Sequence, residues 1–364
     1  SPMTIYEGVQ KLPPAHFVRI GEVGALPKPH PYWSAIDTAR AQPKIQVGVD
    51  EVDGLAEVLD QAVSTQMVAD VPIGAFLSGG IDSSSLVASM QRLSSTPIRT
   101  FTVGFSEAGY DESQYAAEVA AALGTDHTEI VVSPEDAMRV IPALPTIYDE
   151  PFADSSQIPT YLVSKMAREH VTVALSGDGG DELFGGYDRY QQINRLERLR
   201  NSLPASSRRL LGAVFQRLPV EFWDRMGKGL PKFVLPPGLR HRTGYRMHKV
   251  GGLLAADGGS DLYASLMSIE NQGDSLVLGA EGDQLEFVGV PNVQQWDVSP
   301  FERAMLIDTL TYLPGDLLTK VDRASMAVSL EVRVPFLDPD LFQFAWSLSP
   351  AHRVRDGQGK WLLR

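Results

Sequence analysis

Short apolar segments alternate with longer amphipathic segments over roughly the first half of the chain. The apolar segments have strand length and are followed by turn-forming residues; they cover residues 75–77, 98–103, 129–132 and 171–175. Helical spacing of apolar residues predicts helices at residues 55–67, from Ser84 onward, and at 112–123, 137–148 and 158–169. Strands separated by helices require crossover connections. The pattern therefore predicts an α/β fold with a parallel sheet covered by helices.

The remainder of the chain has a weaker pattern. Residues 16–19 alternate like a short strand, and residues 21–46 are rich in Pro, Ala and Gly, which predicts a linker. Residues from about 190 to 300 carry helical patterns without a clear strand, which predicts a mainly helical insertion. Further helices are expected at residues 301–313, 316–327 and 341–348, and a turn at 332–337.

A glycine-rich segment follows the first predicted strand. From Gly74 it reads G-A-F-L-S-G-G-I-D-S-S-S. The turn at residues 78–80 exposes backbone N–H groups, and Ser83 and Ser84 add hydroxyl donors where a helix begins, which is typical of an anion-binding loop. A structural Gly/Ser turn, in which Asp82 only favours the helix N-terminus, is the alternative. The spacing matches neither the Walker P-loop nor the dinucleotide-binding fingerprint.

A second glycine-rich segment follows the strand at residues 171–175. It reads L-S-G-D-G-G-D-E-L-F-G-G-Y over residues 175–187 and carries three carboxylates. Ligands of parallel sheets bind at the carboxyl ends of strands, where both segments lie. Acidic groups would repel a bound phosphate unless a cation intervened, so Asp82 and Asp181 are candidate Mg²⁺ ligands; a tight acidic turn with a structural role is the alternative.

Composition narrows the class of protein. The 45 acidic and 32 basic residues give a net charge of −13, which argues against nucleic acid as a partner. Neither a signal peptide nor a membrane-spanning stretch is evident, so we expect no membrane association and a cytoplasmic location. The sequence has no cysteine, which excludes disulfides, cysteine-ligated zinc and a cysteine nucleophile. Its seven histidines show no metal-binding spacing.

The first segment resembles the pyrophosphate loop of ATP pyrophosphatases, the PP-loop superfamily with an adenine nucleotide α-hydrolase-like fold. Together with the second segment, S-L-E-V-R-V-P-F-L-D at residues 329–338 and G-K-W-L-L-R at 359–364, it is similar to the synthetase domain of glutamine-hydrolysing asparagine synthetases. This resemblance implies a ligase that uses ATP and Mg²⁺ to adenylate a side-chain carboxylate. Ammonia then gives the amide, with AMP and pyrophosphate as the other products.

The resemblance also assigns roles to individual residues. ATP contacts are expected at Leu77, Ser78, Gly79, Gly80, Asp82, Ser83, Ser84, Val103, Ser176 and Gly177. Asp82 and Asp181 are expected to bind the metal. Asp178 is expected to act in forming and aminating the acyl-adenylate, and Lys360 to neutralise charge on the α-phosphate.

The chain departs from this family in several ways. It lacks the cysteine of the glutaminase domain, so we interpret residues 1–46 as a remnant of that domain and a linker. Residues 47–364 would then form a synthetase domain that stops before the C-terminal helices of relatives. Ammonia would come free, or from a glutaminase domain in the full-length protein or another polypeptide. Whether the protein forms a homodimer stays open.

The resemblance also indicates where the acceptor would bind. Residues 149–156 lie where some relatives hold aspartate with threonines and an arginine, and they include no arginine. Tentative substrate residues are Asp149, Glu150, Ser155 and Ser156. Aspartate is the first choice of acceptor. A family amidotransferase or cyclase that uses another carboxylic acid, and a relative that binds nucleotide without catalysis, are the alternatives.

Two further charged clusters have ambiguous roles. Lys320, Asp322 and Arg323 face the substrate or phosphates, or belong to a surface charge network. For Glu331, Arg333 and Asp338 we favour a structural role over a catalytic one.

Overall fold

The computed structural model describes residues 2–21, 28–41, 51–106, 112–229, 243–255, 263, 267, 296 and 298–364. Parts of the predicted linker and of the predicted helical insertion lie outside the described residues. The chain divides into two compact units. The first contains Ser1–Tyr187 and Met305–Arg364, and the second contains Asp188–Ala304. The two glycine-rich segments both belong to the first unit.

A five-stranded parallel sheet forms the centre of the first unit. Its strands are β3 (Ile73–Phe76), β4 (Arg99–Phe105), β5 (Asp126–Val132), β6 (Val173–Leu175) and β7 (Glu331–Arg333). They lie in the order β5-β4-β3-β6-β7, and every neighbouring pair is parallel. The α/β fold with a parallel sheet is therefore confirmed.

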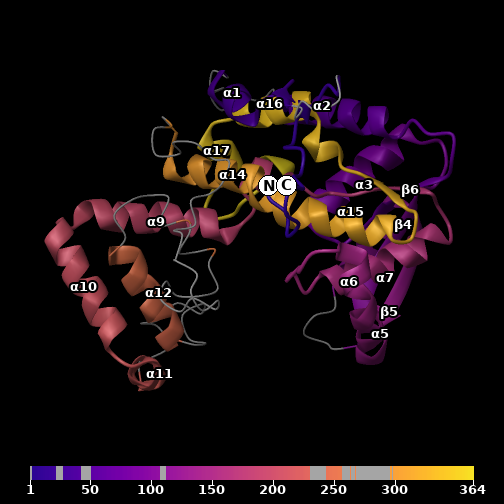
Figure 1. The fold of residues 1–364 in the computed structure, drawn as a ribbon. Helices are drawn as coiled ribbons and strands as arrows, with labels where there is room; N and C mark the ends of the chain where they lie inside the picture. Colours follow the sequence, from indigo (N-terminus) through magenta and orange to yellow (C-terminus); the bar gives the residue numbers. More distant parts are fainter. Residues whose placement is uncertain are drawn as a thin grey trace. The chain divides into compact units, whose positions relative to one another are not determined.

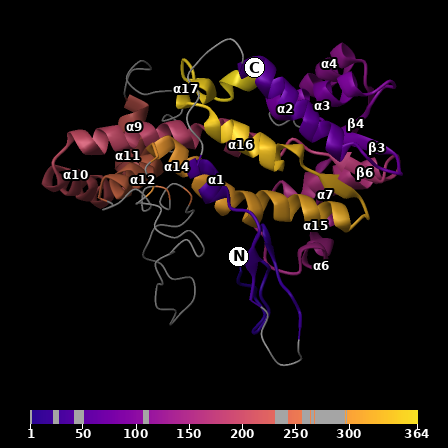
Figure 2. The ribbon, with the colours of Figure 1, turned by 90° about the horizontal axis from the view of Figure 1, so that it is seen from above.

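Helices cover both faces of this sheet. Figure 2 shows α2 (Glu51–Gln66) and α3 (Ile81–Leu93) on one side of the strands, with α7 (Gln157–Arg168) and α15 (Leu318–Met326) on the other. Helix α4 (Ser113–Leu123) contacts β4 and β5. One buried cluster joins the sheet to α7 and to the residue that precedes β7; its members are Phe101, Val163, Met166, Ala167, Val171, Ala174 and Leu330. The buried strand β6 has apolar side chains only, as expected for a central parallel strand.

Strand β7 corrects the turn predicted at residues 332–337. Glu331–Arg333 pair with β6 in the register Ala174↔Val332, and only the following Pro335–Leu337 form a 3₁₀ turn, η5. The strand is three residues long and partly exposed at the sheet edge, so it carries little apolar alternation. The nearby proline further obscured the strand, because proline is typical of turns and of edge strands alike.

Two prolines break the helix predicted at residues 137–148. The structure has α5 (Pro134–Val140), the 3₁₀ helix η1 (Ile141–Ala143) and α6 (Leu144–Tyr148). Pro142 and Pro145 lack the N–H that a continuous helix requires, so each begins a new short turn.

The remaining elements of this unit differ from expectation mainly at their ends. Helix α3 begins three residues before the predicted Ser84, and the predicted helix at 316–327 is preceded by a π-helical turn, η4 (Leu313–Leu317). The predicted linker contains β2 (His30–Pro31) and α1 (Ala35–Ala41), and β2 pairs with β1 (His16–Phe17). The C-terminal elements are α16 (Pro339–Ser347), α17 (Pro350–Arg353) and η6 (Trp361–Leu363).

Helices make up the described part of the second unit (Figure 1). They are α9 (Asp188–Ser202), α10 (Ala205–Arg217), α11 (Val220–Gly229) and α12 (Thr243–Ala255). Trp223 packs edge-on against Phe215, and His248 contacts the Leu218 carbonyl at 2.7 Å. Helix α14 (Pro300–Leu310) runs across the boundary in sequence between the two units.

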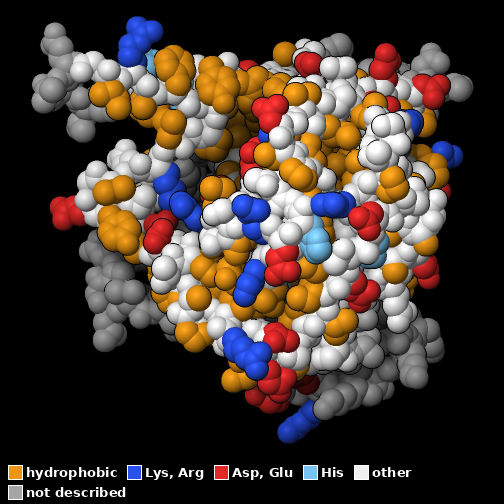
Figure 3. Space-filling model, turned by 90° about the vertical axis from the view of Figure 1, so that its right-hand side faces the viewer, with side chains coloured by type: hydrophobic (Ala, Val, Ile, Leu, Met, Phe, Trp, Pro, Cys, Tyr) orange, Lys and Arg blue, Asp and Glu red, His pale blue; other side chains and the backbone are white. Residues whose placement is uncertain are grey.

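The surface carries both signs of charge. On the face in Figure 3, Lys and Arg side chains lie interspersed with Asp and Glu. Among the described helices, none combines the length and apolar character needed to cross a bilayer.

Candidate active site

The sheet order places a crevice at the carboxyl ends of β3 and β6. From β3 the chain continues outward to β4 and β5, whereas β6 and β7 lie on the other side of β3. Such a reversal of strand order leaves an open crevice that commonly binds ligands. A cavity of about 510 Å³ lies there, and both glycine-rich loops line it together with residues of α7 and α15.

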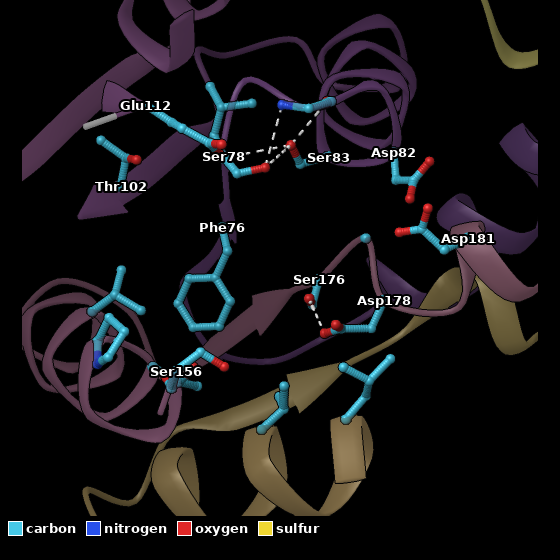
Figure 4. Close-up of a pocket in the computed structure, with 18 of the residues that line it drawn as sticks. Phe76, Ser78, Asp82, Ser83, Thr102, Glu112, Ser156, Ser176, Asp178 and Asp181 are labelled. Carbon is cyan, nitrogen blue, oxygen red and sulfur yellow. Dashed lines mark hydrogen bonds between the residues drawn. The ribbon is translucent and has the colours of Figure 1, made fainter. Parts of the chain in front are cut away.

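Hydrogen bonds within the first loop fix its shape (Figure 4). The Ser83 hydroxyl donates to the Gly80 carbonyl at 3.1 Å and accepts from the Ser78 N–H at 3.1 Å. The Ser78 hydroxyl lies 3.0 Å from the Ser83 hydroxyl. Helix α3 starts at Ile81, so the N–H groups of its first turn have no partner within the helix and are available to an anion.

Two glycines let this loop pack against its neighbours. Gly79 has a φ of +75°, and a Cβ there would lie 2.7 Å from the backbone of Tyr115 and Ala116. A Cβ on Gly177 would lie 2.9 Å from the Ser83 backbone nitrogen. The second loop thus lies directly against the start of α3, which brings the two glycine-rich loops together as their positions at neighbouring strand ends predict.

Lys360 joins the two loops. Its Nζ lies 2.6 Å from Asp82 Oδ2 of the first loop and 2.7 Å from Asp181 Oδ1 of the second. Asp82 and Asp181 point toward one another in Figure 4. The four most specific residues of the predicted site, Asp82, Asp178, Asp181 and Lys360, all line the cavity.

A close approach of two glycine-containing segments holds Lys360 in place. A Cβ on Gly359 would lie 2.5 Å from the Gly185 carbonyl oxygen, and one on Gly186 would overlap the side chains of Lys360 and Asp181. The Lys360 N–H donates to the Phe184 carbonyl at 3.1 Å. These contacts hold the G-K segment at the second loop, although Lys360 lies 179 positions after Asp181 in the sequence.

The buried carboxyl groups of the site have raised pKa values. Burial raises the pKa of Asp82 to about 6, an effect that Lys360 opposes and Asp181 reinforces. Burial also raises the pKa of Asp178, whose carboxylate accepts a hydrogen bond from the Ser176 hydroxyl at 2.5 Å. Burial alone would lower the pKa of Lys360, but Asp82 and Asp181 outweigh it and raise that pKa. The cluster of Asp82, Asp178, Asp181 and Lys360 therefore has more acidic groups than its one ammonium group can neutralise.

The same cluster fits a bound cation. Asp82 Oδ1 is buried and has no hydrogen-bond partner among the described residues. Asp181 faces it, and Glu182 adds a further buried carboxyl whose pKa burial raises to about 7. The described residues include no cluster of three or more His, Asp or Glu arranged as a metal site, so bound phosphate oxygens or water would have to supply the other ligands.

A second charged group lies elsewhere on the cavity wall. Lys320 Nζ donates to Asp154 Oδ2 at 2.8 Å and to the Ser156 hydroxyl at 2.7 Å. Lys320 and Ser156 both line the cavity. Burial would raise the pKa of Asp154, but the hydrogen bonds from Lys320 and Ser156 dominate and lower it. The sequence alone allows two roles for Lys320, and the structure places this residue at the cavity.

The tentative acceptor residues have different locations. Of the four, only Ser156 lines the cavity. Glu150 forms an ion pair with Lys11 and accepts a hydrogen bond from the Ile5 N–H at 3.0 Å, so it fastens the N-terminal segment. Asp149 and Ser155 are exposed.

Most of the predicted nucleotide contacts line the cavity. They are Leu77, Ser78, Gly80, Asp82, Ser83, Val103, Ser176 and Gly177. Gly79 and Ser84 do not: Gly79 packs against α4, and the Ser84 hydroxyl is buried without a hydrogen-bond partner among the described residues. Phe76 and Thr102 also line the cavity beside Val103 and were not predicted from the sequence. Phe76 is the last residue of β3, which was the available signal, whereas Thr102 lies in the middle of β4.

The other charged clusters are structural or exposed. Arg333 pairs with Glu331 at 2.6 Å and donates to the carbonyls of Gln66 and Val68, while Asp338 caps α16 through the Asp340 N–H at 2.9 Å. Glu331 and Arg333 are ion-paired, as expected for a structural cluster, whereas Asp338 makes a separate helix cap. Asp322 and Arg323 are exposed.

Comparison with known proteins agrees with this geometry. The family model described as asparagine synthase matches residues 54–364. The chain belongs to the asparagine synthase family. It is 34% identical over 86% of its length to asparagine synthetase [glutamine-hydrolyzing] 1 of Bacillus subtilis, covering 46% of that protein. It is 35% identical over its whole length to a putative asparagine synthetase [glutamine-hydrolyzing] of Mycobacterium tuberculosis, covering 52% of that protein.

The chain is also similar to a protein with a different name. Amidase chry2 of Gibberella zeae is 26% identical to the chain over 97% of its length, and the chain covers 54% of that protein. The chain spans about half the length of these three relatives.

Proposed function

We propose that the protein is an ATP-dependent amide-forming synthetase. A side-chain carboxylate of the acceptor, with aspartate as first choice, attacks the α-phosphorus of ATP, and the bond to the bridging oxygen breaks to release pyrophosphate. Ammonia then attacks the acyl carbon, AMP leaves, and a proton is released as the amide forms. For aspartate the product is asparagine.

The observation that carries this proposal is the contact of Lys360 with both loops. Lys360 bridges Asp82 and Asp181 at the crevice between β3 and β6, so one ammonium group meets both loops where a phosphate chain would lie. Its positive charge would stabilise negative charge that develops on the α-phosphate. The first loop offers the N–H groups at the start of α3 to the phosphates, and Leu77, directly after β3, and Val103, within the adjacent strand β4, line the cavity.

Asp178 is proposed to act on the acceptor side of the reaction. It lines the cavity next to Ser176, and the Ser176 hydroxyl fixes its carboxylate. Asp82 and Asp181 would hold Mg²⁺. When bound, this ion would neutralise the triphosphate and make pyrophosphate a better leaving group.

Acid-dependent exchange of labelled pyrophosphate into ATP tests the proposal, because it reports adenylation without requiring ammonia. We expect exchange to depend on Mg²⁺ and on an added carboxylic acid, and AMP to accumulate once an ammonium salt is supplied. Asp178→Asn should reduce exchange while leaving nucleotide binding intact. A chain that binds ATP but catalyses no exchange with any acid, even as part of the full-length protein, would be a nucleotide-binding relative and would refute the proposal.

A panel of acids tests the choice of acceptor. One protein similar to the chain is named an amidase and not an asparagine synthetase, so other acids belong in the test. Stimulation of exchange by aspartate above other acids would support asparagine formation, whereas stimulation only by a different acid would assign the adenylation site to an amidotransferase or a cyclase.

A further inference from the structure

Lys320 is a buried cation built into the wall of the cavity. Its side chain is 11% exposed, and it lies on α15, which packs beside α7. The lysine and its carboxylate partner Asp154 are 166 positions apart in the sequence. Burial of an ion pair costs free energy unless its hydrogen bonds are complete, so a donor of this pair without an acceptor indicates a place for a ligand.

The hydrogen bonds around Lys320 use every polar atom of its two partners' side chains. Asp154 Oδ2 accepts from Lys320, and Asp154 Oδ1 accepts from the hydroxyl and the N–H of Ser156 at 2.7 and 2.8 Å. The Ser156 hydroxyl in turn accepts from Lys320. An ammonium group has three N–H donors, and these contacts account for two. Among the described residues, no acceptor for the third is found.

The backbone holds this lysine against the cavity. The π-helical turn η4 directly precedes α15, and Leu317, Lys320 and Val321 all line the cavity. Such turns occur frequently at functional sites. The Tyr148 hydroxyl also donates to the Lys320 carbonyl at 3.3 Å, which ties α15 to α6.

Lys320 and Lys360 serve different parts of the cavity. In Figure 4, Ser156, a partner of Lys320, lies across the cavity from Asp82 and Asp181, the partners of Lys360. They are the two basic residues among the described residues that line it. The phosphate-binding loop and Lys360 belong to one part, which leaves Lys320 for a different anionic group.

We propose that the free N–H of Lys320 binds a second, non-reacting carboxylate of the acceptor, and that Asp154 and Ser156 position the ammonium for it. This inference rests on the proposed function. Lys320 supplies the cation that the segment at residues 149–156 lacks. Lys320 also lies near enough to the buried Asp178 to oppose the rise in its pKa, so an acceptor bound here would lie beside Asp178. The acceptor is then a dicarboxylic acid such as an acidic amino acid.

Exchange of labelled pyrophosphate into ATP tests this inference with matched acids. L-Aspartate is compared with β-alanine, which lacks only its α-carboxylate, and L-glutamate with 4-aminobutyrate. We expect the wild-type chain to use one dicarboxylate at least about tenfold more efficiently than its partner, because a hydrogen bond between charged groups is lost. Lys320→Met should raise the half-saturating concentration of that dicarboxylate by roughly 10- to 100-fold and leave the values for ATP and the monocarboxylate unchanged.

Two further variants keep this test independent of folding. Because Lys320→Met leaves Asp154 unpaired, Lys320→Met/Asp154→Asn removes both charges and should show the same loss of discrimination. Lys165→Met removes an exposed lysine of α7 and should behave like the wild type. Thermal melting of each variant shows that it is folded.

The outcomes separate the two proposals. An unchanged preference in the folded double variant, or a rise in half-saturation for ATP instead of the acid, would overturn the role of Lys320 while adenylation itself stands. A wild-type preference for the monocarboxylates would overturn it too. Absence of exchange with every acid in the wild type would refute the proposed function and the inference with it.

Discussion

The two lysines of the cavity lie in contrasting surroundings. Lys360 contacts carboxylates from two different loops, and one of them, Asp82, keeps a buried oxygen without a hydrogen-bond partner among the described residues. Lys320 contacts one carboxylate, whose two oxygens are both hydrogen-bonded. The pKa of Asp82 is raised to about 6, chiefly by burial, whereas hydrogen bonds lower that of Asp154.

This difference favours a different ligand for each part of the cavity. The carboxylates around Lys360 are incompletely compensated, so a further cation and the phosphates it binds would complete the charge balance there. Among the described residues, the hydrogen bonds of the Lys320–Asp154 pair are complete apart from one N–H of Lys320, so this pair would offer a single directed hydrogen bond to an anion. Nucleotide and acceptor acid would thus bind to separate groups within one cavity.

Removal of Lys360 should have the largest effect. Lys360→Met should lower the rate of pyrophosphate exchange by about 10²–10³-fold, as expected for loss of a group that stabilises charge in the transition state. The measurement is kcat for exchange at saturating ATP and acid, with Lys165→Met as the control. A rate within threefold of wild type in a folded Lys360→Met protein would remove Lys360 from the reaction.

The buried Asp82 should make the free energy of unfolding depend on pH between pH 4 and 6. Its pKa rises from 3.8 to about 6 on folding, so the folded state holds the proton more tightly and stability falls as the pH rises through this interval. The free energy of unfolding of the wild type, relative to that of Asp82→Asn, should therefore decrease by up to about 3 kcal/mol from pH 4 to 6 and level off above pH 7.

Denaturant titrations of both proteins at several pH values measure this difference. Lys360, Asp181 and Asp178 also act on Asp82, and the comparison at each pH keeps these groups in both proteins. A difference that stays constant from pH 4 to 7 would show that folding does not raise the pKa of Asp82.

Asp181→Asn should act mainly through the metal requirement. Replacing a proposed ligand should raise the Mg²⁺ concentration for half-maximal exchange by at least about tenfold, since even outer contacts of metal ligands commonly matter to that extent. Magnesium titrations at fixed ATP test this. If the variant lost activity without any change in its magnesium dependence, Asp181 would act through Lys360 alone.

Glu150→Gln should have the smallest effect. Its ion pair with Lys11 lies at the surface and away from the cavity lining, so we expect exchange rates within twofold of wild type and a loss of stability of about 1 kcal/mol or less. Kinetics with the acid panel and a thermal melt suffice. A selective rise in half-saturation for the acceptor would restore Glu150 as a substrate residue.

Local patterns were enough to predict most of the sheet and the two glycine-rich loops at its edge. Strands β3 and β6 are apolar, and glycines follow each strand after one or two intervening residues, so their carboxyl ends indicated where the cavity lies. The short edge strand β7 and the helix α1 have too few residues to show a clear periodic pattern. The 3₁₀ helix η1 was not predicted because the apolar residues around it keep helical spacing across two prolines.

The acceptor side of the site could not be predicted in the same way. Glu150 and Ser155 belong to the segment that the family resemblance indicated, yet they lie outside the cavity lining. Lys320 and Asp154 meet only because α15 packs beside α7, and no local pattern records such a distant pairing. Lys320 is buried because α15 packs beside α7, and this packing depends on residues throughout the first unit.

The central claim is that the two glycine-rich loops together bind the metal and phosphates of ATP. A crystal structure of the chain with Mn²⁺ and an ATP analogue that resists cleavage between the α- and β-phosphates tests it directly, since anomalous scattering locates the metal. We predict a Mn²⁺ peak in contact with Asp82 and Asp181, and phosphates at the start of α3. A metal and phosphate chain bound at Lys320, or anywhere outside this crevice, would contradict the account.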